Sequence, residues 1–129
     1  MDNQDLQKLT EVLGKYAKDR PKPDRRWDQF TATDDTTVKR AIYLKNQNDL
    51  EGTRIAFLGD DDLTSIAVKS LGKEKISVTV FEIDERLLNL IKRVSQKENL
   101  KVDVEKTDLL EETPRNYRNK FDIVFTDPP

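Results

Sequence analysis

The chain contains no cysteine and no histidine. Without cysteine it cannot form a disulfide framework, a thiolate nucleophile or a zinc–thiolate site. Without histidine it has no imidazole acid–base pair, no Ser-His-Asp triad and no ordinary transition-metal site. Any chemistry in this protein therefore depends on carboxylates, hydroxyls, amines or backbone groups.

An excess of charge of one sign and long apolar runs are also lacking. The 129 residues carry a formal net charge of −2, with 37% charged and 35% hydrophobic residues, which fits one domain of modest size. No apolar run is long enough to span a membrane, and the acidic stretch Met1–Asp5 does not resemble a signal peptide. The near-balanced charge argues against a nucleic-acid-binding surface over the whole protein. We therefore expect a cytoplasmic protein that contacts no membrane and for which nucleic acid is not the partner.

Three zones follow one another along the chain. Residues 1–19 form an expected amphipathic helix, because apolar residues recur every three or four positions at Leu6, Leu9, Val12, Leu13 and Tyr16. Residues 20–50 begin with two prolines that end this helix, and they read as a polar linker or approach segment with one short helix over Thr36–Leu44. Residues 51–129 have a different pattern and form the third zone.

In the third zone, short apolar runs alternate with amphipathic stretches. The pattern predicts helices over Leu63–Leu71 and Asp84–Lys97, and strands over Arg54–Leu58, Ile76–Phe81, Leu100–Val104 and Phe121–Phe125. Strands and helices that alternate at this spacing indicate an α/β fold with a parallel sheet of about four strands. Right-handed crossovers predict helices on both faces of that sheet.

Every predicted strand is followed by at least one acidic residue. Ligands of open parallel sheets bind at the carboxyl ends of the strands, so this concentration of acids at one edge is the sharpest signal in the sequence. The residues in question are Gly59 with Asp60, Asp61 and Asp62 after the first strand, Glu82 and Asp84 after the second, Asp108 after the third, and Asp127 with Pro128 and Pro129 after the fourth.

Each acid also has a structural interpretation. One of the three consecutive aspartates can cap the following helix, although capping needs one acid and not three. Glu82 lies some twenty residues after Gly59, where nucleoside-binding folds place an acid on the ribose hydroxyls, but it could equally be a solvated strand end, with Asp84 as a helix cap. The position of Asp108 is less specific for a function than that of the other acids. Asp127 has a structural alternative, a turn that is stiffened by the two prolines.

The loop after the first strand lacks the glycines of a phosphate-binding loop. It has one glycine, followed by three carboxylates that would repel a pyrophosphate, which disfavours NAD, FAD and ATP. The same carboxylates disfavour the methionine carboxylate of S-adenosylmethionine unless other groups screen them. The sequence therefore favours a nucleoside held by Glu82 and a polycation held by the aspartates.

Three segments resemble the branched-chain polyamine synthases, also called bis(aminopropyl)spermidine synthases. They are the stretch from Phe57 to Ser65 with its Gly-Asp-Asp-Asp motif, the segment Glu82–Arg86, and the segment from Phe121 to Asp127-Pro128-Pro129. Upstream, Arg20-Pro21-Lys22-Pro23 and Asp28-Gln29 are also similar to that family, so the resemblance covers residues 20–129. The Gly-Asp-Asp-Asp stretch is specific, whereas Asp-Pro-Pro is shared with amino-group methyltransferases.

The resemblance implies a Rossmann-like aminopropyltransferase that uses decarboxylated S-adenosylmethionine and alkylates an internal nitrogen of spermidine. It implies that Asp60, Asp61 and Asp62 line the amine site, with one of them as the proton acceptor, and that Asp127 contacts the acceptor nitrogen. Glu82 would hold the ribose and Asp108 the adenine amine, and Gly59 and Asp84 complete the donor-binding set. No metal is required, because a carboxylate accepts the proton of the attacking amine.

The resemblance also implies a longer protein. Members of the family have an N-terminal winged-helix-like domain and seven strands, so the chain is expected to be a fragment that holds the N-terminal half of the transferase domain, inactive by itself. The full-length form could be a homodimer. The alternatives are an S-adenosylmethionine-dependent methyltransferase acting on an amino group, a non-catalytic binding module, and a Mg²⁺ site built from the acids.

Overall fold

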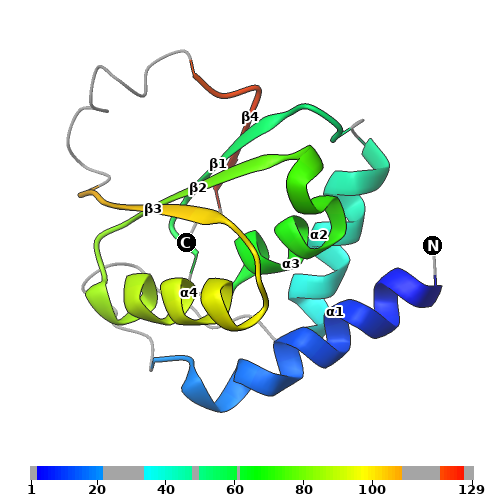
Figure 1. Cartoon of the computed structure of the whole chain (residues 1–129), viewed down its shortest axis with the longest axis horizontal. Coiled ribbons are helices and arrows are strands. Elements are labelled where there is room, and N and C mark those ends of the chain that lie inside the picture. Colours follow the sequence, from blue (N-terminus) through cyan, green and yellow to red (C-terminus); the bar gives the residue numbers. More distant parts are fainter. Residues whose placement is uncertain (1–2, 22–33, 48–49, 61, 109–119, 127–129) are drawn as a thin grey trace.

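Four short strands form the centre of the protein. The structure is a computed structural model, and it describes residues 3–21, 34–47, 50–60, 62–108 and 120–126. Two helices precede the sheet, and two more lie between its first three strands (Figure 1). In chain order the elements are α1 (Asn3–Tyr16), η1 (Ala17–Asp19), α2 (Asp34–Gln47), β1 (Arg54–Leu58), α3 (Thr64–Gly72), η3 (Lys73–Lys75), β2 (Ser77–Glu82), α4 (Glu85–Lys97), β3 (Val102–Lys106) and β4 (Ile123–Thr126).

The strands form one parallel sheet in the order β3-β2-β1-β4. β1 lies between β2 and β4, with Leu58 opposite Phe81 on one side and Thr126 on the other. The chain moves from β1 outward to β2 and β3 and then returns to the other side of β1. The strand order therefore reverses between β1 and β4, which is the position where open α/β sheets bind their ligands. The predicted α/β fold and its four strands are confirmed.

One face of the sheet forms the hydrophobic core. Alternate residues of the strands point to this face because side chains alternate along a strand, and Ile55, Phe57, Val78 and Val80 are all less than 2% exposed. The Phe57 ring lies 5.4 Å from the ring of Phe125, which joins β4 to the same core.

The described helices all pack on this one face, below the sheet in Figure 1. The sequence predicted helices on both faces. The steps from β1 to β2 and from β2 to β3 run in the same direction across the sheet, so right-handed crossovers place α3 and α4 on the same side. Only a connection that reverses direction can place a helix on the opposite face.

The two N-terminal helices belong to the same core as the sheet. Leu9 of α1 and Ala41 of α2 are fully buried, and Val38 is 2% exposed. The segment 20–50, read from the sequence as mostly irregular, thus contains a helix of 14 residues that packs against α3. No helix in the described residues is long and apolar enough to cross a lipid bilayer.

Candidate active site at the carboxyl ends of the strands

A glycine makes the turn at the end of β1. Gly59 has φ +80°, a backbone conformation that residues with a Cβ rarely adopt, and its N–H donates a hydrogen bond of 2.8 Å to the carbonyl oxygen of Phe81. A Cβ at this position would lie 3.9 Å from Glu82 Oε1. The turn therefore brings the backbone after β1 directly against the acid that ends β2.

Asp60 is buried, and both of its carboxylate oxygens accept hydrogen bonds. Its side chain is 3% exposed and accepts a 3.1 Å hydrogen bond from the backbone N–H of Ser65 and another from the Ser65 hydroxyl. Burial raises the pKa of Asp60 well above its ordinary value, the nearby Asp62 carboxylate raises it further, and the Ser65 hydrogen bonds oppose the rise. Asp60 is thus an acid whose proton is held more tightly than that of an ordinary aspartate, at the start of α3.

Asp62 is also buried, and a residue of α2 neutralises it. Its carboxylate accepts a 2.8 Å hydrogen bond from the Thr64 hydroxyl and forms an ion pair with Arg40. The Thr37 hydroxyl of α2 donates a 3.0 Å hydrogen bond to the Asp62 carbonyl oxygen. Since Asp62 is 2% exposed, Arg40 supplies the countercharge that such a buried carboxylate requires. The approach segment therefore holds the acidic loop in place.

Glu82 joins the ends of β1 and β2. Its Oε1 accepts a 3.2 Å hydrogen bond from the Asp60 N–H, and its Oε2 accepts bonds of 2.8 and 3.1 Å from the N–H groups of Ile83 and Asp84. The side chain is 5% exposed, and its own carbonyl oxygen accepts a 2.9 Å bond from the Thr107 N–H. Backbone donors from two turns thus fix the orientation of this carboxylate.

The remaining described candidates lie around the same edge. Asp84 is the N-cap of α4: it accepts a 2.9 Å hydrogen bond from the backbone N–H of Arg86 and forms an ion pair of 2.7 Å with the guanidinium of that residue. Its capping role is the alternative that the sequence left open. Asp108 is half-buried and directly follows Thr107, whose backbone bonds to Glu82. Asp61 and Asp127 lie outside the described residues.

The acids at this edge carry less free negative charge than the sequence suggests. Asp60 is shifted toward its protonated form, and Arg40 pairs with Asp62. A donor carboxylate fits beside this loop only if other groups screen the aspartates, and Arg40 is such a group. No pattern in the sequence indicated that Arg40 would contact Asp62. Thr64 and Ser65 are easier to find, because they directly follow the aspartates at the start of a helix, where hydroxyl and carboxylate side chains often form hydrogen bonds. Within the described residues, no cluster of three or more carboxylates could hold a metal ion.

The chain is similar in sequence to a known protein family and to several known proteins. Residues 8–129 match the branched-chain polyamine synthase A C-terminal domain. The chain is 38% identical over 124 residues to N(4)-bis(aminopropyl)spermidine synthase of Methanocaldococcus jannaschii, and 44% identical over 116 residues to an uncharacterized protein of the same organism, MJ0675. These matches cover 95% and 88% of the chain and 35% and 29% of the two relatives. The chain thus spans about a third of the length of the curated relatives it matches.

Solved structures agree with these matches. The branched-chain polyamine synthase of Thermus thermophilus, in complex with N4-aminopropylspermidine and 5′-methylthioadenosine, superposes with a TM-score of 0.86 at 34% identity, covering 93% of this chain and 35% of that one. Coclaurine N-methyltransferase superposes with a TM-score of 0.62 at 14% identity over 95% of this chain and 40% of that one. The second likeness shows the fold alone, that of the methyltransferase-like α/β proteins.

Proposed function

Because the chain belongs to the branched-chain polyamine synthase A C-terminal domain family, we propose that it is the part of an aminopropyltransferase that binds the sulfonium donor and the amine. The reaction would move the aminopropyl group of decarboxylated S-adenosylmethionine onto a nitrogen of spermidine, in branched polyamine biosynthesis. The observation that carries the proposal is the hydrogen bond between the Asp60 N–H and Glu82, which joins the candidate amine loop to the candidate ribose acid at the switch point.

The proposed reaction needs only a proton acceptor and positioning groups. The lone pair of the secondary amine attacks the aminopropyl carbon that is bonded to the sulfonium sulfur. A C–N bond forms, the C–S bond breaks, and its electron pair neutralises the sulfur to give 5′-methylthioadenosine. The proton leaves the nitrogen for a carboxylate, and further carboxylates hold the cationic acceptor in line.

The chemistry of the Thermus thermophilus complex supports the choice of donor. That protein is bound to 5′-methylthioadenosine and N4-aminopropylspermidine. Methylthioadenosine is what remains when a sulfonium loses its aminopropyl group, whereas methyl transfer from S-adenosylmethionine would leave S-adenosylhomocysteine. The charge of the acidic loop gives weaker support, since Arg40 neutralises part of it.

The residue roles follow from the family resemblance and the physical state of each acid. We propose that Asp60, Asp61 and Asp62 form the amine side of the site together with Asp127. Burial raises the pKa of Asp60, so this carboxylate holds an accepted proton more tightly than an ordinary aspartate does, which supports the role of proton acceptor.

The donor side of the proposed site combines the turn after β1 with the ends of β2 and β3. Glu82 would bind the ribose hydroxyls and Asp108 the adenine amine. Gly59 allows the close approach of the backbone, and Asp84 orients the start of α4 beside Glu82. The homodimer and the cytoplasmic location predicted from the sequence remain predictions.

Methyl transfer to an amino group is the second candidate, and the Arg40–Asp62 ion pair is the observation that favours it. A screened aspartate loop repels the carboxylate of S-adenosylmethionine less than three free carboxylates would. The two candidates leave different sulfur products, so one assay separates them.

The test incubates the full-length protein with spermidine and, in separate reactions, with decarboxylated S-adenosylmethionine or S-adenosylmethionine. Mass spectrometry should detect methylthioadenosine and a spermidine derivative heavier by one aminopropyl group with the first donor, and no methylated amine with the second. Consumption of S-adenosylmethionine alone, with S-adenosylhomocysteine as the product, would show that the proposed reaction is wrong. Glu82→Ala should raise the KM for the donor more than it lowers kcat, as expected for a ribose ligand.

A further inference from the structure

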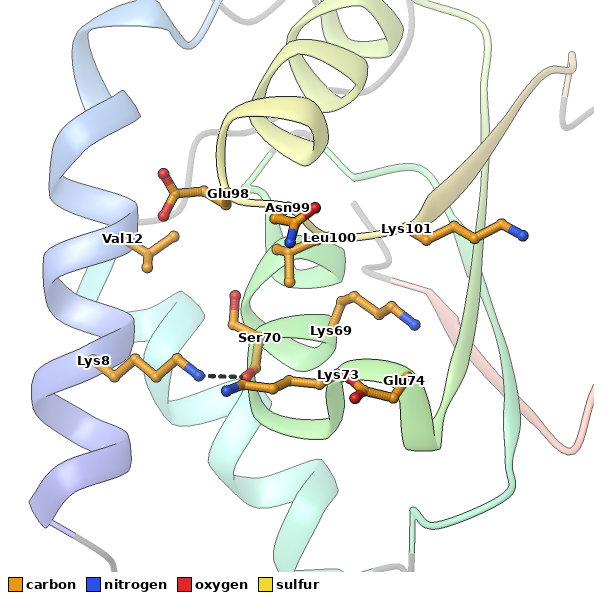
Figure 2. Close-up of a pocket in the computed structure, with 10 residues that line it drawn as sticks. All are labelled: Lys8, Val12, Lys69, Ser70, Lys73, Glu74, Glu98, Asn99, Leu100 and Lys101. Atoms are coloured by element: carbon orange, nitrogen blue, oxygen red, sulfur yellow. Dashed lines mark hydrogen bonds between the residues drawn. The ribbon is translucent and has the colours of Figure 1, made fainter.

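A cavity of about 490 Å³ lies at the opposite end of α3 from the acidic loop. It is lined by α1, the C-terminal end of α3 with η3, and the turn between α4 and β3, and it opens to solvent (Figure 2). The nine residues of α3 separate it from the aspartates by about 13 Å of helix. The candidate active site therefore makes no use of this cavity.

Positive charge is in excess around the cavity. Four lysines line it, and none of them forms an ion pair with any residue in the described ranges: Lys8, Lys69, Lys73 and Lys101. Two acids also line it, Glu74 and Glu98. Glu98 is engaged elsewhere, because it pairs with Lys15 at 3.3 Å and accepts a 2.7 Å hydrogen bond from the Tyr16 hydroxyl. Among the described residues that line the cavity, Glu74 is then the one acid not engaged in this way, against four lysines, while Asp5 and Asp103 act on Lys8 and Lys69 from outside the lining.

Two of the ammonium groups crowd together at the end of α3. Lys8 Nζ donates a 2.9 Å hydrogen bond to the Ser70 carbonyl oxygen, and the Lys73 ammonium lies beside it (Figure 2). Burial lowers the pKa of Lys8, and repulsion from Lys73 lowers it further, against an opposing effect of Asp5. One lysine is enough to satisfy a carbonyl at a helix C-terminus. The second adds repulsion, which an anion between the two would relieve.

The backbone of Lys73 is also unusual. This residue follows Gly72 and has φ +48° and ψ −132°, a region that residues with a side chain rarely occupy. Such a conformation is strained, and strained residues are found most often at active sites and where ligands are held. A glycine would be unstrained there, but it would not supply the ammonium group.

A third lysine lies deeper in the cavity wall. Lys69 is 5% exposed and donates a 2.5 Å hydrogen bond to the Ile76 carbonyl oxygen, which uses one of its three N–H donors. Burial lowers the pKa of Lys69, and Lys101 lowers it further, while Asp103 and Glu74 oppose the shift. In Figure 2, Lys69 and Lys101 extend away from the pair formed by Lys8 and Lys73. The cationic groups are thus one close pair, Lys8 and Lys73, with two further lysines spread along the cavity wall.

From this arrangement we infer that the cavity is a binding site for a small molecule with two or more linked phosphate groups. One phosphate would lie between Lys8 and Lys73, and the rest would extend toward Lys69. Lysine is a point-charge ligand that suits phosphate, and lysines are the cationic residues among the described residues that line the cavity. The site is separate from the proposed transferase site, so an experiment can disprove either proposal without affecting the other.

The test measures binding of tripolyphosphate to the full-length protein by isothermal titration calorimetry, at an ionic strength held constant with sodium chloride. We expect saturable binding with one site per chain. Lys8→Gln and Lys73→Gln should each weaken it about tenfold, the loss expected for one charge-assisted hydrogen bond. Lys92→Gln, on the exposed face of α4, is the matched control and should leave the affinity unchanged.

A variant that is expected to strengthen binding distinguishes an effect on the site from a loss of folding, because misfolding can only weaken binding. Glu74→Gln removes a negative charge from the cavity wall. This change should tighten binding about threefold, because the carboxylate repels the negatively charged phosphates. Absence of saturable binding, or equal weakening by Lys92→Gln, would overturn the proposal. So would tighter binding of a single-stranded oligonucleotide through the same lysines, because the site would then serve a nucleic acid.

Discussion

At the scale of single residues, Asp60 combines burial with a hydrogen-bonded carboxylate. Asp60→Asn keeps the oxygen that accepts from the Ser65 N–H but removes the ability to hold or release a proton. We expect the variant to fold and to lower kcat about 10²–10³-fold, the usual size of a lost general base. Steady-state kinetics of the full-length protein measure this, with Glu85→Gln as an exposed acid-to-amide control. An unchanged kcat would remove Asp60 from the proposed mechanism.

The same substitution predicts a pH dependence of stability. Because the pKa of Asp60 is raised in the folded state, its contribution to stability is full at acidic pH and is lost as the pH rises through the raised value. Asparagine does not ionise, so the free energy of unfolding of Asp60→Asn relative to the unsubstituted protein should increase as the pH rises from about 4, the ordinary pKa of an aspartate, through the raised value. Urea unfolding at several pH values tests this. A difference that stays constant or falls with pH would contradict it.

Arg40 is the second residue with a strong expected effect. Arg40→Gln leaves the Asp62 carboxylate buried without its cation, and removing one partner of a buried ion pair costs about 3 kcal/mol. Denaturant unfolding should show this loss, and the double variant Arg40→Gln with Asp62→Asn should recover most of it. Lys39→Gln, the adjacent exposed position on α2, is the control. Equal stability of the single and double variants would mean that the ion pair contributes little.

The candidate site could be predicted from the sequence only where its signals are local. An acid after each strand is visible because the strands are visible, and Asp84 is recognisable as a cap because it precedes an amphipathic stretch. Arg40 could not be found, since it lies 22 residues before Asp62 and meets it only through the packing of α2 on α3. The burial of Asp60 was also hidden, because a run of three aspartates reads as solvated charge.

At the scale of elements, α4 depends on its first residues. Its N-cap, Asp84, is 1% exposed and satisfies the Arg86 N–H. Asp84→Ala should destabilise the protein by about 1 kcal/mol through the lost cap. Glu85→Gln, a change of an exposed residue in the same first turn, should cost less than the lost cap. Chemical denaturation compares the two, and equal effects would show that the cap itself is unimportant.

The elements themselves were largely predictable. Each of the four apolar runs became a strand shifted by at most two residues, because a short run of β-branched and aromatic residues buried in a parallel sheet has few alternatives. The placement of helices on both faces stays a prediction, because most of the connection from β3 to β4 lies outside the described residues. Helix placement depends on strand order, which no local pattern contains, so helices were expected on two faces while those described lie on one.

At the scale of the whole molecule, the N-terminal helices and the sheet share one hydrophobic core. Leu9 of α1 is fully buried in the same cluster as Ile91 of α4. Leu9→Ala and Ile91→Ala should therefore each cost about 2–5 kcal/mol and lower one common unfolding transition. Coincident melting curves from far-ultraviolet circular dichroism and near-ultraviolet circular dichroism would show this. A separate early transition in Leu9→Ala alone would mean that α1 unfolds independently, as the sequence-based division at residue 19 suggests.

The position of β4 has a kinetic consequence. β1 and β2 are joined by a short helical crossover, whereas β4 reaches β1 from far along the chain: the Arg54 N–H bonds to the Asp122 carboxylate across 68 residues. Long loops close slowly, so we expect β4 to add to the sheet after β1, β2 and β3 have formed. It lies at the edge of the described sheet with Val124 exposed, and its amides should exchange with solvent before those of β1. Within the described sheet, we therefore expect the switch point between β1 and β4 to assemble last and to open first, so that the lifetime of this strand pair limits how long the edge beside Leu58 stays ordered.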